Sequence, residues 1–149
     1  MLSRPQNDKP MLEQNIIERL NATAPRFIEL LGGSVVSVDI EARTLAFEFN
    51  VCSDYCHSGD IVQGGFITAM LDAAMAHALF AQDTEIVNVA SLDVNTSYLE
   101  VTRAGKLRAE AHIIKSTYKT AFLESQLYDD NDTKTAIASS VAKLIRTKA

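Results

Sequence analysis

The chain has 149 residues, of which 47% are hydrophobic and 22% charged, an ordinary composition for one globular domain. Its formal net charge of -5 argues against a nucleic-acid surface, which normally carries a basic excess. The charge does not exclude an anionic ligand, because a local pocket can be basic on an acidic protein.

We expect no targeting or membrane segment. The first ten residues, MLSRPQNDKP, are polar and lack the apolar core of a secretory signal. The longest apolar run, Ile61–Ala81, contains Asp72 and His77, which would be costly in lipid, so we reject a transmembrane span. Two cysteines without an export signal indicate free thiols and a cytoplasmic protein.

The N-terminal part is predicted to be helical, because apolar residues recur at helical spacing over Met11–Leu31. Thr23, followed two residues later by Pro25, resembles a new N-cap with proline in the first turn, which predicts two short helices. Gly32-Gly33 would then end the second helix in a left-handed conformation.

From Ser34 the apolar pattern has a period of two, which predicts a β-hairpin with one buried face. The residues expected on that buried face are Val36, Val38, Ile40, Leu45, Phe47 and Phe49.

The middle of the chain is expected to hold a loop, Val51–Val62, and then a helix, Phe66–Ala81. The helical segment contains no glycine or proline and is rich in alanine, leucine and methionine. It is apolar almost all round, and such a helix belongs inside other elements.

The remainder has strand periodicity. In its first strand one face would carry Ala90, Leu92, Val94, Thr96 and Tyr98, and the opposite face Ser91, Asp93, Asn95 and Ser97. Three further strands fit Leu107–Ile113, Thr120–Tyr128 and Thr135–Ile145. An antiparallel sheet curled around the central helix would cover the apolar faces of both. We therefore predict an α+β fold, with residues 1–33 as a helical segment before a domain over residues 34–149.

Asp72 is the only acid in the predicted central helix, where a carboxylate is costly unless it is paired, hydrogen-bonded or lines a cavity. Gly64-Gly65 precede the helix, where unpaired backbone N–H groups point outward and a ligand carbonyl could approach closely. Thr68 and Gly65 share a helical stripe with Asp72, but Gly65 lies about 10 Å away along the axis. That separation is too long for one reacting carbon, so the simplest shared site takes the carboxylate from a second subunit.

The segment carrying these residues resembles the phenylacetate-pathway-type branch of the hotdog thioesterases. The signature of that family is an Asn or His, then a His-Gly-Gly or Gln-Gly-Gly turn, then a Leu-Asp pair on the central helix. Here His57 matches the first position, Gln63-Gly64-Gly65 the turn, and Leu71-Asp72 the pair. The likeness extends roughly over Ser34–Ile145.

The resemblance implies a hotdog fold and hydrolysis of an acyl-CoA by a homodimer or a dimer of dimers. The backbone N–H groups of the Gly64-Gly65 pair would polarise the thioester carbonyl. Asp72 of the neighbouring subunit would act as general base or as nucleophile. His57 and Gln63 would orient the carbonyl or the water, and Ser91 would help to place the water. No cofactor is implied, since the CoA thioester is the substrate.

Two positions depart from the pattern of the family. Gln63 replaces the commoner histidine, which leaves the role of the turn residue open, and Thr117-Tyr118 stand where many members carry glycine. The cations that could bind the CoA phosphates, although scattered cations are usually just solvated, are Arg103, Lys106, Arg108, Lys115 and Lys119. The side chains expected to line the acyl pocket are Phe66, Met70 and Met75.

No metal site is expected. Cys52, Cys56 and His57 form a Cys-x3-Cys-His string that fits neither haem attachment nor a closed zinc site. His77 lies about 140° around the helix from Asp72 and is expected in the core or at an interface. Four site residues also have ordinary explanations, as a buried aspartate, a solvated histidine, a turn residue and a strand serine: Asp72, His57, Gln63 and Ser91.

Two other functions remain open. A hydratase or dehydratase acting on acyl thioesters also pairs a loop histidine with a helix acid, as His57 and Asp72 could; however, its loop usually carries prolines, and none follows Pro25 here. A non-catalytic acyl-CoA-binding module would need an output domain, for which we expect no room, and would have little reason to retain a costly buried acid.

Overall fold

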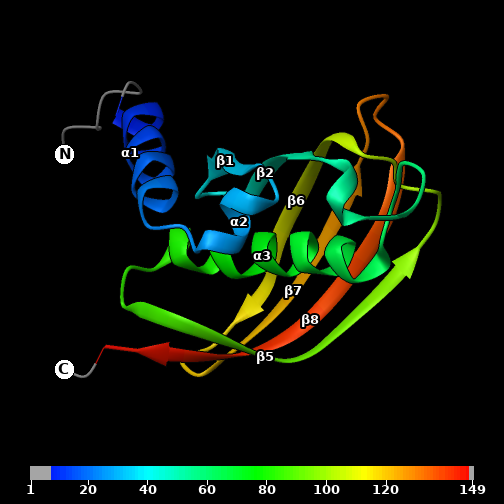
Figure 1. The fold of residues 1–149 in the computed structure, drawn as a ribbon. Helices are drawn as coiled ribbons and strands as arrows, with labels where there is room; N and C mark the ends of the chain where they lie inside the picture. The colour runs from blue at the N-terminus through cyan, green and yellow to red at the C-terminus, as the bar shows by residue number, and fades with distance from the viewer. Residues whose placement is uncertain (1–7, 148–149) are drawn as a thin grey trace, which may run out of the picture.

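An antiparallel sheet curves around one long helix, α3 (Gly64–Gln82), in the computed structural model, which describes residues 8–147 (Figure 1). The other helical elements are α1 (Asp8–Ala22), α2 (Arg26–Leu30) and the 3-10 turn η1 (Ser53–Tyr55). The strands are β1 (Gly33–Asp39), β2 (Thr44–Val51), β3 (Cys56–Ser58), β4 (Ile61–Val62), β5 (Ile86–Tyr98), β6 (Gly105–Ser116), β7 (Thr120–Tyr128) and β8 (Lys134–Arg146). The predicted α+β architecture, with a curled sheet around a central helix, is confirmed.

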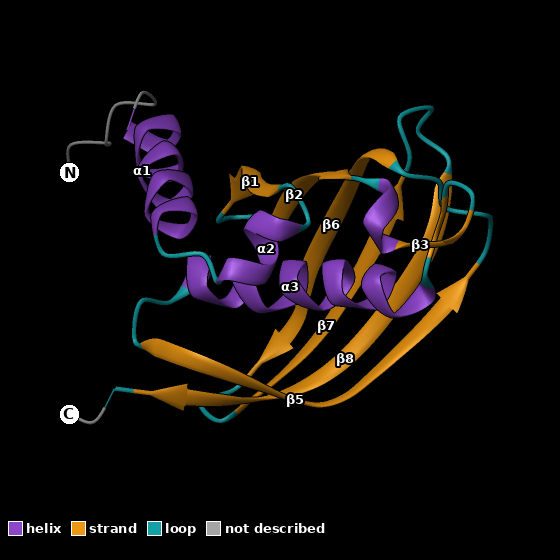
Figure 2. Cartoon of the chain, viewed as in Figure 1, coloured by secondary structure: helices purple, strands orange, loops and turns teal. Residues whose placement is uncertain are grey.

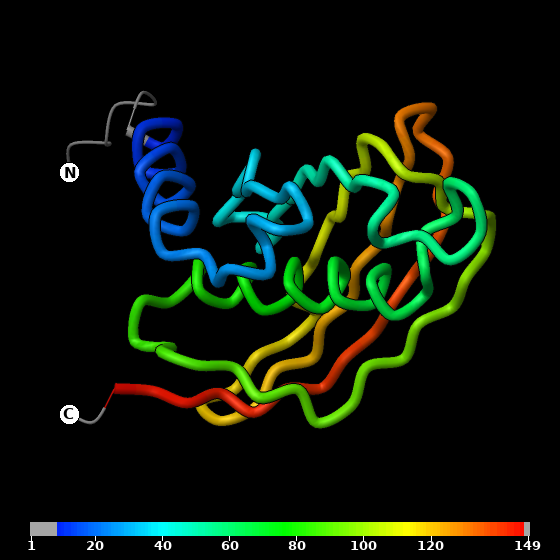
Figure 3. Tube along the Cα trace, in the orientation of Figure 1, coloured from blue at the N-terminus to red at the C-terminus, as the bar shows by residue number. Residues whose placement is uncertain are grey.

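The six strands of the main sheet follow the order β1-β2-β6-β7-β8-β5, so β1 and β5 form its two edges (Figure 2). α1 and α2 pack against β1 at one edge. At the other edge β5 pairs with β8 and has no second partner in the described part of the chain (Figure 3). The sheet therefore has a long open edge beside α3.

The core lies between α3 and the concave face of the sheet. From α3, Met70 and Met75 are 0% and 1% exposed, and from β2, Phe47 and Phe49 are both 0% exposed. The two phenylalanine rings stack with centroids 5.2 Å apart. Met70 and Met75 are thus enclosed in the core, and the prediction that they line an acyl pocket is wrong. Phe66, the third residue predicted to line that pocket, is 37% exposed.

α3 is long and apolar enough to cross a membrane by length and composition alone, but 56% of that apolar window is buried inside the fold. This burial is typical of a core helix. The sheet and the N-terminal helices supply the apolar surroundings that the sequence of α3 requires.

The N-terminal helical segment ends at Gly32, as predicted, with a left-handed φ of 68°. A Cβ at that position would collide with the Asn50 carbonyl oxygen, so only glycine fits. Thr23 is not the N-cap of α2, a place taken by Pro25; instead its hydroxyl donates to the Arg19 carbonyl of α1 at 3.0 Å. Residues 1–7 lie outside the described residues, so the absence of a secretory signal stays a prediction. The domain boundary at residue 33 also stays a prediction.

A β-bulge in β1 overturns the predicted alternation of the hairpin. Val35 pairs with Phe47 and Ser37 with Ala46, which leaves Val36 as the extra residue. Val36 is consequently 44% exposed, whereas Val35 and Val38 are buried. The predicted loop over residues 51–62 also contains more structure than expected, namely η1 and the short ribbon of β3 and β4.

Candidate active site

The N-terminus of α3 leaves one backbone donor free. Gln63 is the N-cap, and its side-chain Oε1 accepts the Gly65 N–H at 2.7 Å. Glycine at position 65 makes room for this bond, because a Cβ there would approach Gln63 Oε1 to 2.8 Å. The Gly64 N–H has no acceptor within residues 8–147. Of the two glycines, Gly64 is therefore the one with a donor available to a ligand.

A groove of about 470 Å³ opens beside this free donor. His57 and Gly64 both line it, with apolar walls from Ile67, Leu99 and Val101. The His57 side chain is exposed, and its Nδ1 lies 2.8 Å from the Ser58 hydroxyl. The groove thus combines an apolar wall, an imidazole and the positive end of a helix dipole.

Asp72 lies further along α3 and is half-buried. Its Oδ1 accepts a hydrogen bond of 2.9 Å from the Ser91 hydroxyl of β5. An oriented, partly exposed carboxylate of this kind can take a proton from water or attack a carbonyl carbon. The bond to Ser91 leaves the rest of the carboxylate open to such a partner.

Ser91 reaches Asp72 because of a second β-bulge. Ser91 pairs with Ala142 and Asp93 with Val141 of β8, so Leu92 is the extra residue of β5. As a result Leu92 is 65% exposed and Ser91 turns towards α3. The prediction that Ser91 lies on the strand face opposite Thr96 and Tyr98 is wrong for this reason.

The predicted residues form two groups in one chain. His57, Gln63 and the two glycines gather at the N-terminus of α3, while Asp72 and Ser91 lie at its middle. Eight residues separate Gly64 from Asp72, which corresponds to about 12 Å along the helix axis. Asp72 does not line the groove that His57 and Gly64 share.

Sequence reasoning missed a chain of hydroxyl groups that links β5 to α3. Tyr98 donates to the Gly64 carbonyl at 2.9 Å, and Thr68 lies 3.1 Å from the Tyr98 hydroxyl and 2.9 Å from that of Thr96. The sequence did contain a signal for this chain. The strand period places Thr96 and Tyr98 on one face of β5, and the helical period places Thr68 on the stripe of α3 that carries Asp72.

The remaining candidates take ordinary positions. Three of the five predicted cations pair with carboxylates: Arg103 with Asp60, Lys106 with Glu48, and Arg108 with Glu110 and Asp132. His77 lies in the core, 6% exposed, with Nδ1 2.8 Å from the Ala73 carbonyl, and burial lowers its pKa below the usual value. Among the described residues, no group of three or more His, Cys, Asp or Glu could hold a metal ion.

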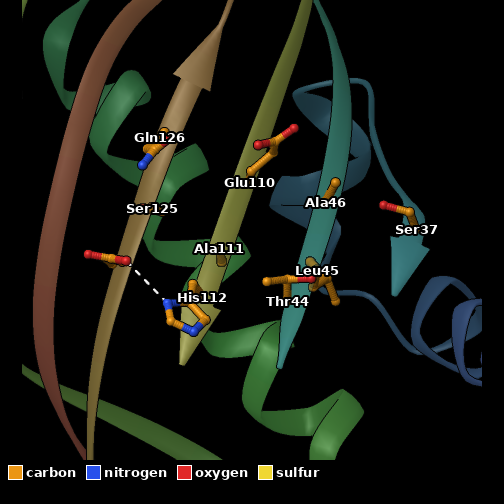
Figure 4. Close-up of a pocket in the computed structure, with 10 residues that line it drawn as sticks. Ser37, Thr44, Leu45, Ala46, Glu110, Ala111, His112, Ser125 and Gln126 are labelled. Atoms are coloured by element: carbon orange, nitrogen blue, oxygen red, sulfur yellow. Dashed lines mark hydrogen bonds and ion pairs between the residues drawn. The ribbon is translucent and has the colours of Figure 1, made fainter. Parts of the chain in front are cut away.

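A separate hollow of about 280 Å³ lies on the face of the sheet turned away from α3 (Figure 4). It contains His112, whose Nδ1 lies 3.1 Å from Glu124 Oε1. None of the predicted site residues lines this hollow. The residues that the sequence predicts for the site lie instead at the N-terminus and the middle of α3 and on β3 and β5.

Comparisons with known proteins identify the family and the fold. The sequence profile of the thioesterase superfamily matches residues 59–136, which carry the Gly-Gly turn, α3 and β5 to β7. No curated protein matches the sequence.

Solved structures share most of the architecture. A phenylacetic acid degradation-related protein from Ralstonia eutropha is 26% identical and superposes with a TM-score of 0.78, covering 87% of this chain and 99% of its own. A thioesterase from Haemophilus influenzae is 18% identical, with a TM-score of 0.78 and coverage of 87% and 90%. The PaaI protein of E. coli is 16% identical, with a TM-score of 0.77 and coverage of 90% and 96%. The last two likenesses concern the fold alone, and it is the hotdog fold expected from the sequence.

Proposed function

The chain belongs to the thioesterase superfamily, and from that premise we propose that it hydrolyses an acyl-CoA at a site built from two subunits. Hydrolysis of an acyl thioester follows from the family; the CoA moiety, the catalytic residues and the shared site are the proposal. The observation that carries it is the unpaired N–H of Gly64, a residue that lines the groove at the N-terminus of α3.

Gly64 supplies the oxyanion donor in this mechanism. The thioester carbonyl enters the groove and accepts the Gly64 N–H, where the helix dipole favours the negative charge that develops on the oxygen. His57 lies on the same groove and orients the carbonyl or the water. Gln63 acts indirectly, because its side chain occupies the Gly65 N–H and so leaves Gly64 as the donor.

Asp72 supplies the base or the nucleophile. As a base it takes a proton from water, the resulting hydroxide adds to the carbonyl carbon, and collapse of the tetrahedral intermediate expels the CoA thiolate, which takes the proton back from Asp72. As a nucleophile it attacks the carbonyl carbon and expels the CoA thiolate, which leaves a mixed anhydride; water then hydrolyses the anhydride to the free acid and restores Asp72. In both versions Ser91 holds the carboxylate through its 2.9 Å hydrogen bond.

The carboxylate that serves Gly64 comes from a partner subunit. A distance of about 12 Å along one helix is too long for a single reacting carbon. The open edge of β5 gives a second copy a place to pair, and the free edge of a strand of 13 residues is a surface that proteins normally cover. Twofold pairing is the commonest closed arrangement, so we propose a homodimer or a dimer of dimers. The protein acts in the cytoplasm without a cofactor.

The test is a panel of short, medium, long and aromatic acyl-CoA substrates with thiol release as the readout. We expect hydrolysis of some member in the presence of a chelator. Asp72→Asn should lower the rate by ~10²- to 10⁴-fold, the range for loss of a general base. A folded Asp72→Asn protein with the wild-type rate would contradict the mechanism.

The same panel separates the alternatives. A change in enoyl absorbance without thiol release would indicate a hydratase or dehydratase that uses His57 and Asp72. Tight binding of an acyl-CoA without any turnover would indicate a binding module.

A further inference from the structure

The hydroxyl chain between β5 and α3 has a defined direction. The Gly64 carbonyl can only accept, so the Tyr98 hydroxyl donates to it, at 2.9 Å. The Tyr98 oxygen is then free to accept from Thr68, and Thr68 from Thr96, at 3.1 Å and 2.9 Å. Donation therefore runs from Thr96 through Thr68 and Tyr98 to the first turn of α3.

This chain ends at the peptide unit next to the proposed oxyanion donor. The N–H of Gly64 belongs to the Gln63–Gly64 peptide, whose carbonyl is held by the N–H groups of Phe66 and Ile67 at 3.0 Å and 3.3 Å. The following peptide, Gly64–Gly65, is held by Gln63 Oε1 at its N–H and by Tyr98 at its carbonyl. The Gln63–Gly64 and Gly64–Gly65 peptide planes are joined at the Gly64 Cα, so only the φ and ψ angles of Gly64 set their relative orientation.

Two successive glycines give this turn more conformational freedom than any other pair of residues would. A site that stabilises an oxyanion needs its donor fixed before the charge develops. The hydrogen bond from Tyr98, which lies on β5, restricts the Gly64–Gly65 peptide plane and hence the φ and ψ angles of Gly64. The ring also fills the space where a side chain at position 64 would lie, because a Cβ there would approach the Tyr98 ring to between 3.0 and 3.3 Å.

We propose that Tyr98 is a positioning residue, whose hydroxyl holds the Gly64-Gly65 turn so that the Gly64 N–H points into the groove. The inference rests on the proposed function and adds a residue that acts through Gly64 rather than on the substrate. Thr68 supports Tyr98 in turn, since its hydroxyl donates to the Tyr98 oxygen.

The test compares Tyr98→Phe with wild type on the best acyl-CoA of the panel. Phenylalanine keeps the ring that lines the groove and removes only the hydroxyl. We expect kcat to fall roughly 3- to 10-fold, the factor for one net hydrogen bond, while KM changes by less than about twofold. Thr68→Val should lower kcat by a smaller factor. Tyr128→Phe is the control, because that hydroxyl donates to Gln126 Oε1, at 2.5 Å, on the other face of the sheet.

A spectroscopic readout isolates the positioning role. The probe is an acyl-CoA analogue in which CH₂ replaces the thioester sulfur, with ¹³C at the carbonyl. Binding to wild type should lower the carbonyl infrared frequency through the Gly64 N–H, and Tyr98→Phe should lose a measurable part of that shift. Tyr128→Phe should retain all of it.

The outcomes are separable. Tyr98→Phe with unchanged kcat and an unchanged carbonyl shift would overturn the inference, as would a rise in KM at constant kcat, which indicates a wall residue only. If Tyr98→Phe does not fold, Thr68→Val with an unchanged carbonyl shift would overturn it instead. Wild type that releases no thiol from any acyl-CoA would instead refute the proposed function.

Discussion

The contact between Ser91 and Asp72 gives the proposed base its orientation, since the Ser91 hydroxyl donates to Asp72 Oδ1 at 2.9 Å. Ser91→Ala leaves the carboxylate in place and removes only this bond, so kcat/KM should fall by about tenfold, less than in Asp72→Asn. Thiol release measures the effect. Ser97→Ala is the matched control. Ser97 also lies on β5, but it lines a hollow together with outward residues of β7 and β8 and does not contact Asp72. Ser91→Ala with full activity would remove Ser91 from the mechanism.

We expect His77 to make the stability of the fold depend on pH. Burial lowers the pKa of His77 in the folded protein, against about 6.5 when unfolded, so the unfolded chain binds the proton more readily. The contribution of neutral His77 is present above about pH 6.5 and is lost as the pH falls below it. Denaturant midpoints between pH 7.5 and 5.5 should therefore decrease, and His77→Leu should flatten this decrease. An unchanged slope in His77→Leu would show that other groups cause it.

The residues of the site differ in how far the sequence could define them. The turn at Gly64-Gly65 and the acid at Asp72 stand out because glycine pairs and a lone carboxylate in an apolar helix are unusual locally. Which of the two glycines has a free N–H depends on the rotamer of Gln63, and the spacing of residues in the sequence does not define a rotamer. The role of Tyr98 depends on a contact between residues 34 positions apart, which local sequence patterns do not define.

The β-bulges at Val36 of β1 and Leu92 of β5 explain most of the errors at the level of elements. The period-two pattern succeeds for β2 and β6, which have no bulge between them and bury Phe47, Phe49, Leu107 and Ala109. It fails in β1 and β5, where one extra residue shifts the faces. The bulged residues cannot be recognised from their residue types, because Val36 and Leu92 are both apolar although they are exposed.

The bulge at Leu92 of β5 yields a prediction. Deleting Leu92 removes the extra residue, and the shortened strand then alternates regularly with Ser91 and Val94 both still facing α3. Because Leu92 is 65% exposed, little packing is lost. The deletion variant should fold with a Tm within about 5 °C of wild type, as followed by circular dichroism.

Deletion of Ala90 is the control, because it should turn Val89 and the start of β5 towards the wrong face. Val89 packs against the core in the present register. We expect a much lower Tm or no cooperative transition. Equal stability of the two deletion variants would contradict the assignment of Leu92 as the bulged residue.

At the scale of the whole molecule, the enclosed helix and the antiparallel sheet follow from the apolar character of α3 and from strands that need one covered face. The position of β5 beside β8 does not follow from local patterns, since it depends on which strands meet after a long connection. That position leaves the edge of β5 open near Asp72 and Ser91. The proposed assembly rests on this edge, and light scattering should not return the monomer mass of 16.3 kDa at micromolar concentration.

The shared site can be tested directly with mixed subunits. His57→Ala and Asp72→Asn should each fold and be nearly inactive as pure homodimers. When an equal mixture is unfolded and refolded, about half of the dimers become mixed pairs by random assortment. If His57 of one chain works with Asp72 of the other, each mixed dimer has one site with both lesions and one intact site. Activity should then recover to roughly a quarter of wild type.

If both residues serve a site within one chain, every site keeps a lesion and nothing recovers. Native mass spectrometry confirms the mixed dimers, and their presence without any recovered activity would refute the shared site while leaving the fold intact.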